Sequence, residues 1–219
     1  MDDPLERAAD LLQPVHEEVA SLRLLGGLAC RAHLGTLARR SDDLDVVAMS
    51  ASARDALLDH LRKLGFAVGP SGGWWRAVRG KGKDREIVDV APHPIVNPRT
   101  FDAMTLRSAP MSLTFGDASL HAVGIEDLLV LKLVAGRDQD HVDLVLLTAH
   151  ADPSAAEIAR RLELDDLGRL AAGSVANARH ALSKGYLSEV FAQLVGRAPT
   201  ERERSAFELF LVQLGEAGL

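Results

Sequence analysis

Strands and helices are distributed unevenly along this chain, and that distribution is the strongest constraint on its fold. Short apolar and β-branched segments separated by turn residues cluster before residue 123. From Glu126 onward the hydrophobic periodicity is helical. Because the strands cluster instead of alternating strictly with long helices, the pattern favours an α+β fold over a doubly wound parallel sheet. We expect an α+β core with a mixed sheet over 1–123 and a helical region over 124–219.

Individual elements are predicted from the same pattern. The first helix follows Asp3-Pro4, an N-cap and a proline at the first helical position, and two capping boxes, Ser154 with Glu157 and Thr200 with Glu203, mark later helix starts. Two further helices are predicted at 28–34 and 52–64. The expected strands are 22–25, 44–49, 74–78, 86–90, 111–115 and 118–123, the last four forming two hairpins.

Composition excludes several classes of protein. The 219 residues are 47% hydrophobic and 26% charged, which is typical of a soluble globular chain and not of a disordered or fibrous one. The longest apolar run, 128–135, is interrupted by Lys132 and is far shorter than the ~20 residues of a membrane span. The acidic start lacks the basic region of a secretory signal, and the single Cys30 excludes a disulfide framework. We expect a cytoplasmic protein without membrane contact.

The charge balance argues against nucleic-acid binding by net charge, but one basic segment stands out. The net charge is −6, and the aromatic residues make up 4%, too few for a stacking platform. Trp74 and Trp75 point to opposite faces of a strand, so we expect one in the core and the other available to stack on a base. The basic segment lies just after these tryptophans and contains Arg76, Arg79, Lys81, Lys83 and Arg85. It is either a solvated hairpin tip or a contact for RNA or nucleotide phosphates.

An acidic cluster carries the most chemical information. Asp43 and Asp45 open a strand and share one face of it, where two carboxylates ~6–7 Å apart repel by roughly 2–3 kcal/mol. A strand tolerates this pair most readily when a divalent cation lies between the carboxylates, and Mg²⁺ prefers such ligands together with phosphate oxygens. Asp89, between β-branched residues of a later strand, is either a solvated edge residue or a third ligand.

A glycine pair precedes this cluster at a strand-to-helix junction. Gly26 and Gly27 allow backbone N–H groups to approach a phosphate at the start of the following helix. The order of strand, glycine pair, helix, loop and Asp-x-Asp strand therefore predicts a phosphate cradle followed by a metal-binding pair.

These motifs resemble the signature of the nucleotidyltransferase superfamily, and most closely its AbiEii-type branch, which includes the MenT toxins. The resemblance lies in Leu24-Leu25-Gly26-Gly27-Leu28-Ala29 and in Arg39-Arg40-Ser41-Asp42-Asp43-Leu44-Asp45. A second block, 126–132 with 137–144, resembles the family's helical Lys…Arg-x-x-Asp-x-x-Asp-Leu pattern. Together they cover residues 22 to 145. Gly27 stands where the broader superfamily has serine, and the loop from Gly27 to Asp43 is longer than in the minimal enzymes.

The resemblance implies a reaction and a set of roles. A nucleoside monophosphate would pass from a nucleoside triphosphate to an acceptor hydroxyl, with two Mg²⁺ ions held by Asp43, Asp45 and Asp89. Asp89 could also accept the proton of the acceptor. The nucleotide would be bound by Gly26, Gly27, Arg39, Ser41, Lys132 and Asp143, with Lys132 reaching a phosphate and Asp143 orienting it or holding a helix pair.

Several alternatives stay open at this point. Lys132 could instead lay its stem over apolar surface with its ammonium in water, and Arg137, Asp138 and Asp140 could be ion pairs on a helix surface. The acceptor could be RNA such as a tRNA 3′ end, as in toxin-type relatives with an antitoxin partner. It could also be a small aminoglycoside-like antibiotic, or the protein could be a catalytically silent nucleotide- or partner-binding module.

Overall fold

The computed structural model describes residues 3–16, 21–41, 43–82, 85–98 and 100–219. The chain forms two compact units. The sheet unit consists of residues 1–32 and 41–124, and the helical unit consists of residues 33–40 and 125–219. Strands occur in the first and helices dominate the second, which confirms the predicted α+β class.

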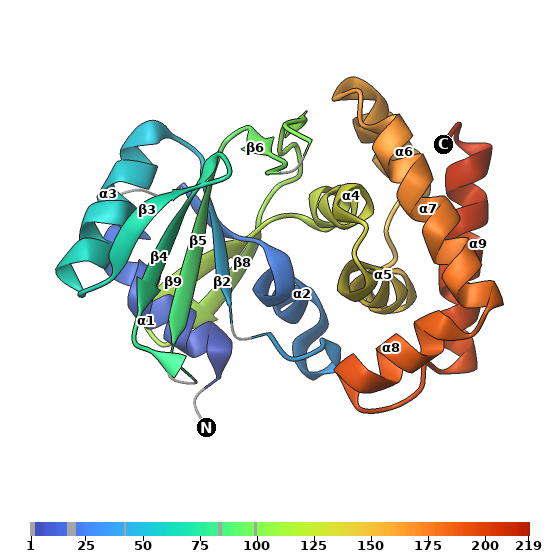
Figure 1. Cartoon of the computed structure of the whole chain (residues 1–219), viewed down its shortest axis with the longest axis horizontal. Helices are drawn as coiled ribbons and strands as arrows, with labels where there is room; N and C mark the ends of the chain where they lie inside the picture. The colour runs from blue at the N-terminus through green and yellow to red at the C-terminus, as the bar shows by residue number, and fades with distance from the viewer. Residues whose placement is uncertain (1–2, 17–20, 42, 83–84, 99) are drawn as a thin grey trace. The chain divides into compact units, whose positions relative to one another are not determined.

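The described residues of the sheet unit form a seven-stranded mixed sheet (Figure 1). Its central strands β2 and β5 run parallel, as do β1 and β9, whereas the other neighbouring strands are antiparallel. In spatial order the strands are β3 (Ala67–Ser71), β4 (Trp74–Arg79), β5 (Glu86–Pro92), β2 (Leu44–Ala48), β1 (Leu22–Leu24), β9 (Ala118–Ala122) and β8 (Met111–Phe115). A separate two-stranded ribbon pairs β6 (Ile95–Val96) with β7 (Ala103–Met104).

Two helices pack on the sheet, and a third begins beside the candidate site. Helix α1 (Pro4–His16) packs on β9, α3 (Ala51–Lys63) packs on β2, β3 and β5, and the two helices contact each other. The predicted start of α1 is confirmed, because the backbone N–H of Leu5 donates to the Asp3 carboxylate at 3.0 Å. Helix α2 (Gly26–Leu34) begins directly after β1 and is followed by the short helix η1 (Gly35–Leu37).

The two tryptophans do not divide between core and surface as predicted. Both are only half-buried. Trp74 donates its indole N–H to the carbonyl of Val96 at 2.6 Å, and the Arg54 guanidinium lies 4.5 Å from the ring centroid of Trp75. Strand β4 is next to the edge of the sheet, and of its residues only Ala77 is buried. The edge strand β3 was missed because Gly69 and Pro70 are poor strand formers, and proline is tolerated mainly at such an edge.

In the helical unit, α5 (Asp138–His150) is the central element (Figure 1). It packs against α4, α8 and α9, and every residue from 140 to 147 is buried. Because neighbouring helices surround α5, its polar residues Asp140, His141 and Asp143 are buried together with its apolar ones. The surrounding helices are α4 (Ile125–Ala135), α6 (Ala155–Leu164), α7 (Gly168–Ser183), α8 (Tyr186–Val195) and α9 (Glu201–Glu216). None of the helices in the described part of the chain has the length and apolar character needed to cross a membrane.

The two predicted capping boxes differ in outcome. At the start of α9, Thr200 and Glu203 form the reciprocal box, and the buried Glu203 carboxylate also binds Arg197. At the start of α6, Ser154 accepts from the backbone N–H of Glu157 at 3.2 Å, but the Glu157 carboxylate turns to arginines on its own helix. The box at Ser154 is therefore only half formed, because arginines are stronger partners for a carboxylate than a backbone N–H.

Candidate active site

Two of the three predicted carboxylates lie on neighbouring strands of the sheet unit, and the third directly precedes one of these strands. Asp45 on β2 is directly opposite Asp89 on β5 in a parallel register. Paired residues of adjacent parallel strands point to the same face, and such strands are only about 4.8 Å apart. Asp43 is exposed and lies two residues before Asp45, at the entrance to β2. The fold thus brings Asp45 and Asp89 together from positions 44 residues apart in the sequence.

Arg76 completes this cluster. It lies on β4 opposite Asp89 and forms a bidentate ion pair with it, with Nε–Oδ1 and Nη2–Oδ2 distances of 2.7 Å. The hydrogen bonds and the charge of Asp89 raise the pKa of Arg76 above its ordinary value, and the charges of Asp43 and Asp45 add to this. One guanidinium is therefore within the field of all three carboxylates.

In the sequence, Arg76 belongs to a basic segment predicted to be either a solvated hairpin tip or a contact for RNA or nucleotide phosphates, and its pairing with Asp89 was not predicted. The signal was present, because β4 and β5 form a hairpin in which Arg79 pairs with Glu86. Three residues further along each strand, the same register places Arg76 opposite Asp89.

Of the other basic residues of the hairpin, Arg79 is also paired with a carboxylate. Arg79 binds the Glu86 carboxylate at 2.7 Å, donates to the carbonyl of Leu64 at 3.0 Å and lies over the ring of Phe66. Lys81 is exposed at the tip, and Lys83 lies outside the described residues. The predicted acceptor role of these residues stays a prediction.

Position 26 requires glycine for two reasons: the backbone conformation of the strand-to-helix junction and the close approach of the Asp45 side chain. Its φ of +58° lies in the left-handed region, and a Cβ at this position would be 2.0 Å from Oδ2 of Asp45. The adjacent Leu25 N–H donates to the Asp45 carbonyl at 2.8 Å, which joins the start of α2 to β2. Gly27 is buried in the first turn of α2. The junction therefore places the Asp45 carboxylate against the N-terminus of a helix, where a negative charge is favourable.

Replacing Gly26 with alanine is expected to destabilise the protein by about 2–4 kcal/mol, because strain at positive φ adds to a clash with Asp45. Gly116→Ala is the matched control. Gly116 has the same φ of +58°, but nothing lies within 4 Å of the position of its Cβ. The difference between the two variants in chemical denaturation measures the contact with Asp45, and equal losses would show that only φ matters.

The donor set fits a hard divalent cation. Carboxylate oxygens are the ligands that Mg²⁺ prefers, and Asp43 and Asp45 supply them beside the N-terminus of α2. In the present conformation both oxygens of Asp89 accept from Arg76. No three acidic, histidine or cysteine side chains within the described ranges are arranged to hold a metal ion. Asp89 would join Asp43 and Asp45 as a ligand in competition with Arg76.

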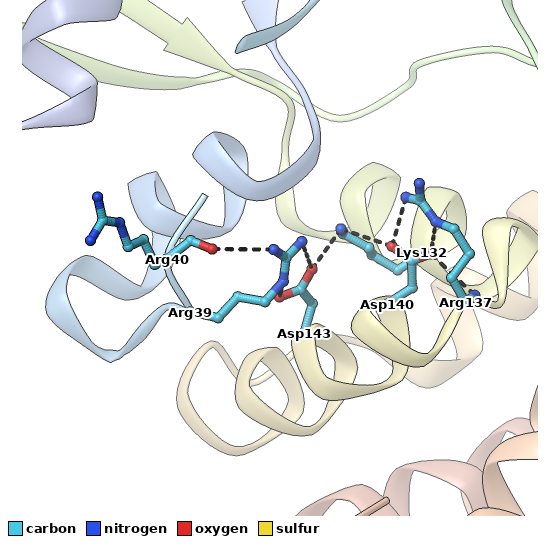
Figure 2. Close-up of polar contacts among 6 residues, drawn as sticks. All are labelled: Arg39, Arg40, Lys132, Arg137, Asp140 and Asp143. Atoms are coloured by element: carbon cyan, nitrogen blue, oxygen red, sulfur yellow. Dashed lines mark hydrogen bonds and ion pairs between the residues drawn. The ribbon is translucent and has the colours of Figure 1, made fainter. Parts of the chain in front are cut away.

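A second ionic cluster lies within the helical unit (Figure 2). The ammonium of Lys132 on α4 donates to Asp140 at 3.0 Å and to Asp143 at 2.6 Å, both on α5. Lys132 is 3% exposed, and both aspartates are 0% exposed. Arg39 binds the same Asp143 carboxylate through two contacts of 2.9 and 3.2 Å, and Arg137 binds Asp140.

This cluster corrects two expectations. The alternative in which the Lys132 ammonium reaches water is wrong, because the ammonium lies between two buried carboxylates. Asp140 is not on a helix surface. Burial raises the pKa of Asp140, but the charges of Lys132 and Arg137 and their hydrogen bonds outweigh burial and lower it overall. Asp143 does hold the α4–α5 helix pair through Lys132.

The nucleotide-binding roles of these residues stay predictions. Arg39, Lys132 and Asp143 are brought together in the helical unit, whereas Gly26 and Gly27 belong to the sheet unit. Ser41 is half-buried in the segment between η1 and β2. The contact between Arg39 and Asp143 was not predicted, because 104 residues separate them in the sequence.

The fold is similar to that of a nucleotidyltransferase-like protein of known structure. An antigenic nucleotidyltransferase-like protein from Paracoccidioides brasiliensis superposes with a TM-score of 0.51 and 16% sequence identity, covering 90% of this chain and 98% of that protein. JHP933 from Helicobacter pylori aligns with a TM-score of 0.49 at 15% identity over 99% of this chain and 95% of its own. ANT(2")-Ia in complex with adenylyl-2"-tobramycin aligns with a TM-score of 0.41 at 18% identity over 82% and 97%. No family model and no curated protein sequence matches the chain.

Proposed function

We propose that this protein is a divalent-metal-dependent nucleotidyltransferase that moves a nucleoside monophosphate from a nucleoside triphosphate to an acceptor hydroxyl. The observation that supports this most directly is the parallel register of Asp45 and Asp89 beside Gly26. It combines two carboxylates with a helix N-terminus, which are the groups needed for a metal and for phosphates. The nucleotidyltransferase-like fold agrees with this proposal.

Each residue has a part in the proposed reaction. Asp43, Asp45 and Asp89 would hold Mg²⁺, which when bound neutralises charge on the phosphates and polarises the acceptor oxygen. The N–H groups of Gly26 and Gly27 would contact phosphate oxygens. The acceptor oxygen bonds to the α-phosphorus, the bond to the bridging oxygen of the β-phosphate breaks, and pyrophosphate leaves. The hydroxyl proton would pass to Asp89.

The cluster in the helical unit would contribute to nucleotide binding. Arg39, Lys132 and Arg137 carry three positive charges against the two carboxylates of Asp140 and Asp143. Arginine and lysine side chains are suitable partners for an anionic phosphate. We propose that Arg39, Ser41 and Lys132 contact the nucleotide while Asp143 orients Lys132.

We propose RNA, such as a tRNA 3′ end, as the acceptor. Lys81 and Arg85 are exposed on the β4–β5 hairpin. Burial therefore does not prevent their side chains from contacting a phosphate backbone. A toxin of this type would need an antitoxin partner in its cell.

A small cationic acceptor of the aminoglycoside type is the second candidate. It is favoured by the pairing of Arg76 with Asp89 and of Arg79 with Glu86, which reduces the positive charge the hairpin offers to RNA. The net charge of −6 also attracts a polycation.

Label transfer tests the proposal and distinguishes the acceptors. The protein is incubated with Mg²⁺ and each α-labelled nucleoside triphosphate, with total RNA in one arm and a panel of aminoglycosides in the other. We expect label in one arm only, its loss with EDTA, and no transfer from γ-labelled nucleotides. Label in RNA supports the first acceptor and label in a small product the second. Absence of label from every arm would refute the enzyme and leave a silent nucleotide- or partner-binding protein.

A further inference from the structure

We propose that Arg76 is a positioning residue that holds Asp89 until a divalent cation arrives. On this view the guanidinium and the cation are alternative partners of the same carboxylate, and one is exchanged for the other. This inference rests on the proposed function, because it concerns the metal site formed by Asp43, Asp45 and Asp89.

The geometry of the pair supports an exchange. Both oxygens of Asp89 accept from Arg76, at 2.7 Å each. A carboxylate that accepts from a guanidinium through both oxygens already has its charge paired, so a cation that binds it competes with the guanidinium. An arginine guanidinium keeps its charge throughout the physiological pH range, so a paired Arg76 repels a cation at Asp89 and is not neutralised in place.

The surroundings make this movement feasible. The Arg76 side chain is 47% exposed, whereas that of Asp89 is only 14% exposed. The carboxylate is therefore fixed by the sheet, and the arginine has solvent into which it can swing. Exposed ion pairs contribute little to stability, so release of Arg76 does not threaten the fold.

Charge favours the cation as the final partner. Asp43 and Asp45 act on Arg76 together with Asp89, so one positive charge faces three negative ones. A divalent cation brings twice the charge of the guanidinium to the same carboxylates. A released Arg76 would stay tethered on β4 beside the site, where the phosphates of a nucleotide are suitable partners.

The neighbouring pair on the same two strands provides a matched control. Arg79 on β4 pairs with Glu86 on β5 in the same register and at the same distance of 2.7 Å. The contact uses one guanidinium nitrogen in place of two, and both partners are well exposed. Removing Arg79 thus removes a similar arginine from the same strand without freeing Asp89.

Binding of Mn²⁺ to the nucleotide-free protein, followed by the electron paramagnetic resonance of the free ion, tests the proposal. Arg76→Met keeps an unbranched apolar side chain but removes the competing charge. We expect Arg76→Met to bind Mn²⁺ about tenfold more tightly than the wild type, and Arg79→Met to differ by less than about twofold. Adding Asp45→Asn should weaken binding in both backgrounds, which locates the ion. Melting curves confirm that each variant is folded.

The exchange is also visible in the wild-type protein, without any substitution at Arg76. The Nε–H of an arginine in a bidentate pair has a distinct ¹⁵N NMR signal. We expect Mg²⁺ to shift the Arg76 signal toward that of a free arginine while the Arg79 signal stays in place.

The outcomes separate this inference from the proposed function. If Mn²⁺ binds in an Asp45-dependent way but Arg76→Met binds it equally or more weakly, and Mg²⁺ leaves the Arg76 signal unchanged, the exchange is refuted and the metal-dependent enzyme stands. If neither protein binds Mn²⁺ through Asp45, both the exchange and the metal dependence of the proposed function are refuted.

Discussion

Asp45→Asn is expected to lower nucleotidyl transfer by about a thousandfold or more while the protein stays folded. Asparagine has nearly the same shape as aspartate but removes one negative charge from the pair formed with Asp89 across β2 and β5. A metal ion stabilises the transition state of phosphoryl transfer by several kcal/mol, and this stabilisation depends on its carboxylate ligands. Loss of one carboxylate also relieves repulsion within the cluster, so we expect a Tm within about 4 °C of the wild type.

The measurement is the initial rate of label transfer at saturating Mg²⁺, compared with that of Asp117→Asn. Asp117 is exposed in the turn between β8 and β9 of the same unit, so this variant makes the same chemical change away from the cluster. We expect it to retain full activity. An Asp45→Asn protein with wild-type rates would remove Asp45 from the catalytic machinery and leave the carboxylate pair without a catalytic role.

Much of the sheet and of the carboxylate cluster could be predicted because their signals are local. Because Asp43 and Asp45 share one face of a strand, alternation predicts Leu44 and Val46 on the opposite, core face, and both are buried. The Gly26-Gly27 pair marked the strand-to-helix junction. These features depend on periodicity and turn chemistry within a few residues, which the sequence contains in full.

The partners of the charged residues could not be predicted in the same way. Arg39 meets Asp143 across 104 residues, and nothing near either residue specifies the other. Asp140 looked like a member of a surface i,i+3 pair with Arg137, and that pair does form, but the burial of Asp140 comes from the helices packed around α5. Tertiary packing decides whether a local ion pair faces solvent or the core.

The burial of Lys132 has a chemical consequence. A lysine buried between two aspartates must be balanced by them, because an unpaired charge in the core is very costly. Lys132 therefore stabilises the α4–α5 pair whether or not it also contacts a nucleotide. Changes in activity on substitution of Lys132 are interpretable only together with the stability of the variant.

Lys132→Met is accordingly expected to destabilise the protein by about 3 kcal/mol, with a Tm lower by roughly 10 °C. The substitution leaves the fully buried carboxylates of Asp140 and Asp143 with only Arg137 and Arg39 as partners. Thermal and urea unfolding measure the loss. Lys184→Met, at the exposed end of α7, is the control and should change stability by less than about 0.5 kcal/mol.

A second substitution and the pH dependence show whether unbalanced buried charge causes the loss of stability in Lys132→Met. Lys132→Met combined with Asp140→Asn should regain part of the lost stability, because Arg39 still pairs with Asp143 and no carboxylate is left short of a partner. The lowered pKa of Asp140 means that its stabilising contribution is present above about pH 4 and is lost as the pH falls through the folded-state pKa. The stability gap between Lys132→Met and the wild type should therefore be full at pH 7 and narrow below about pH 4. A Lys132→Met protein as stable as Lys184→Met at pH 7 would show that α4 and α5 do not need the Lys132 ammonium to stay together.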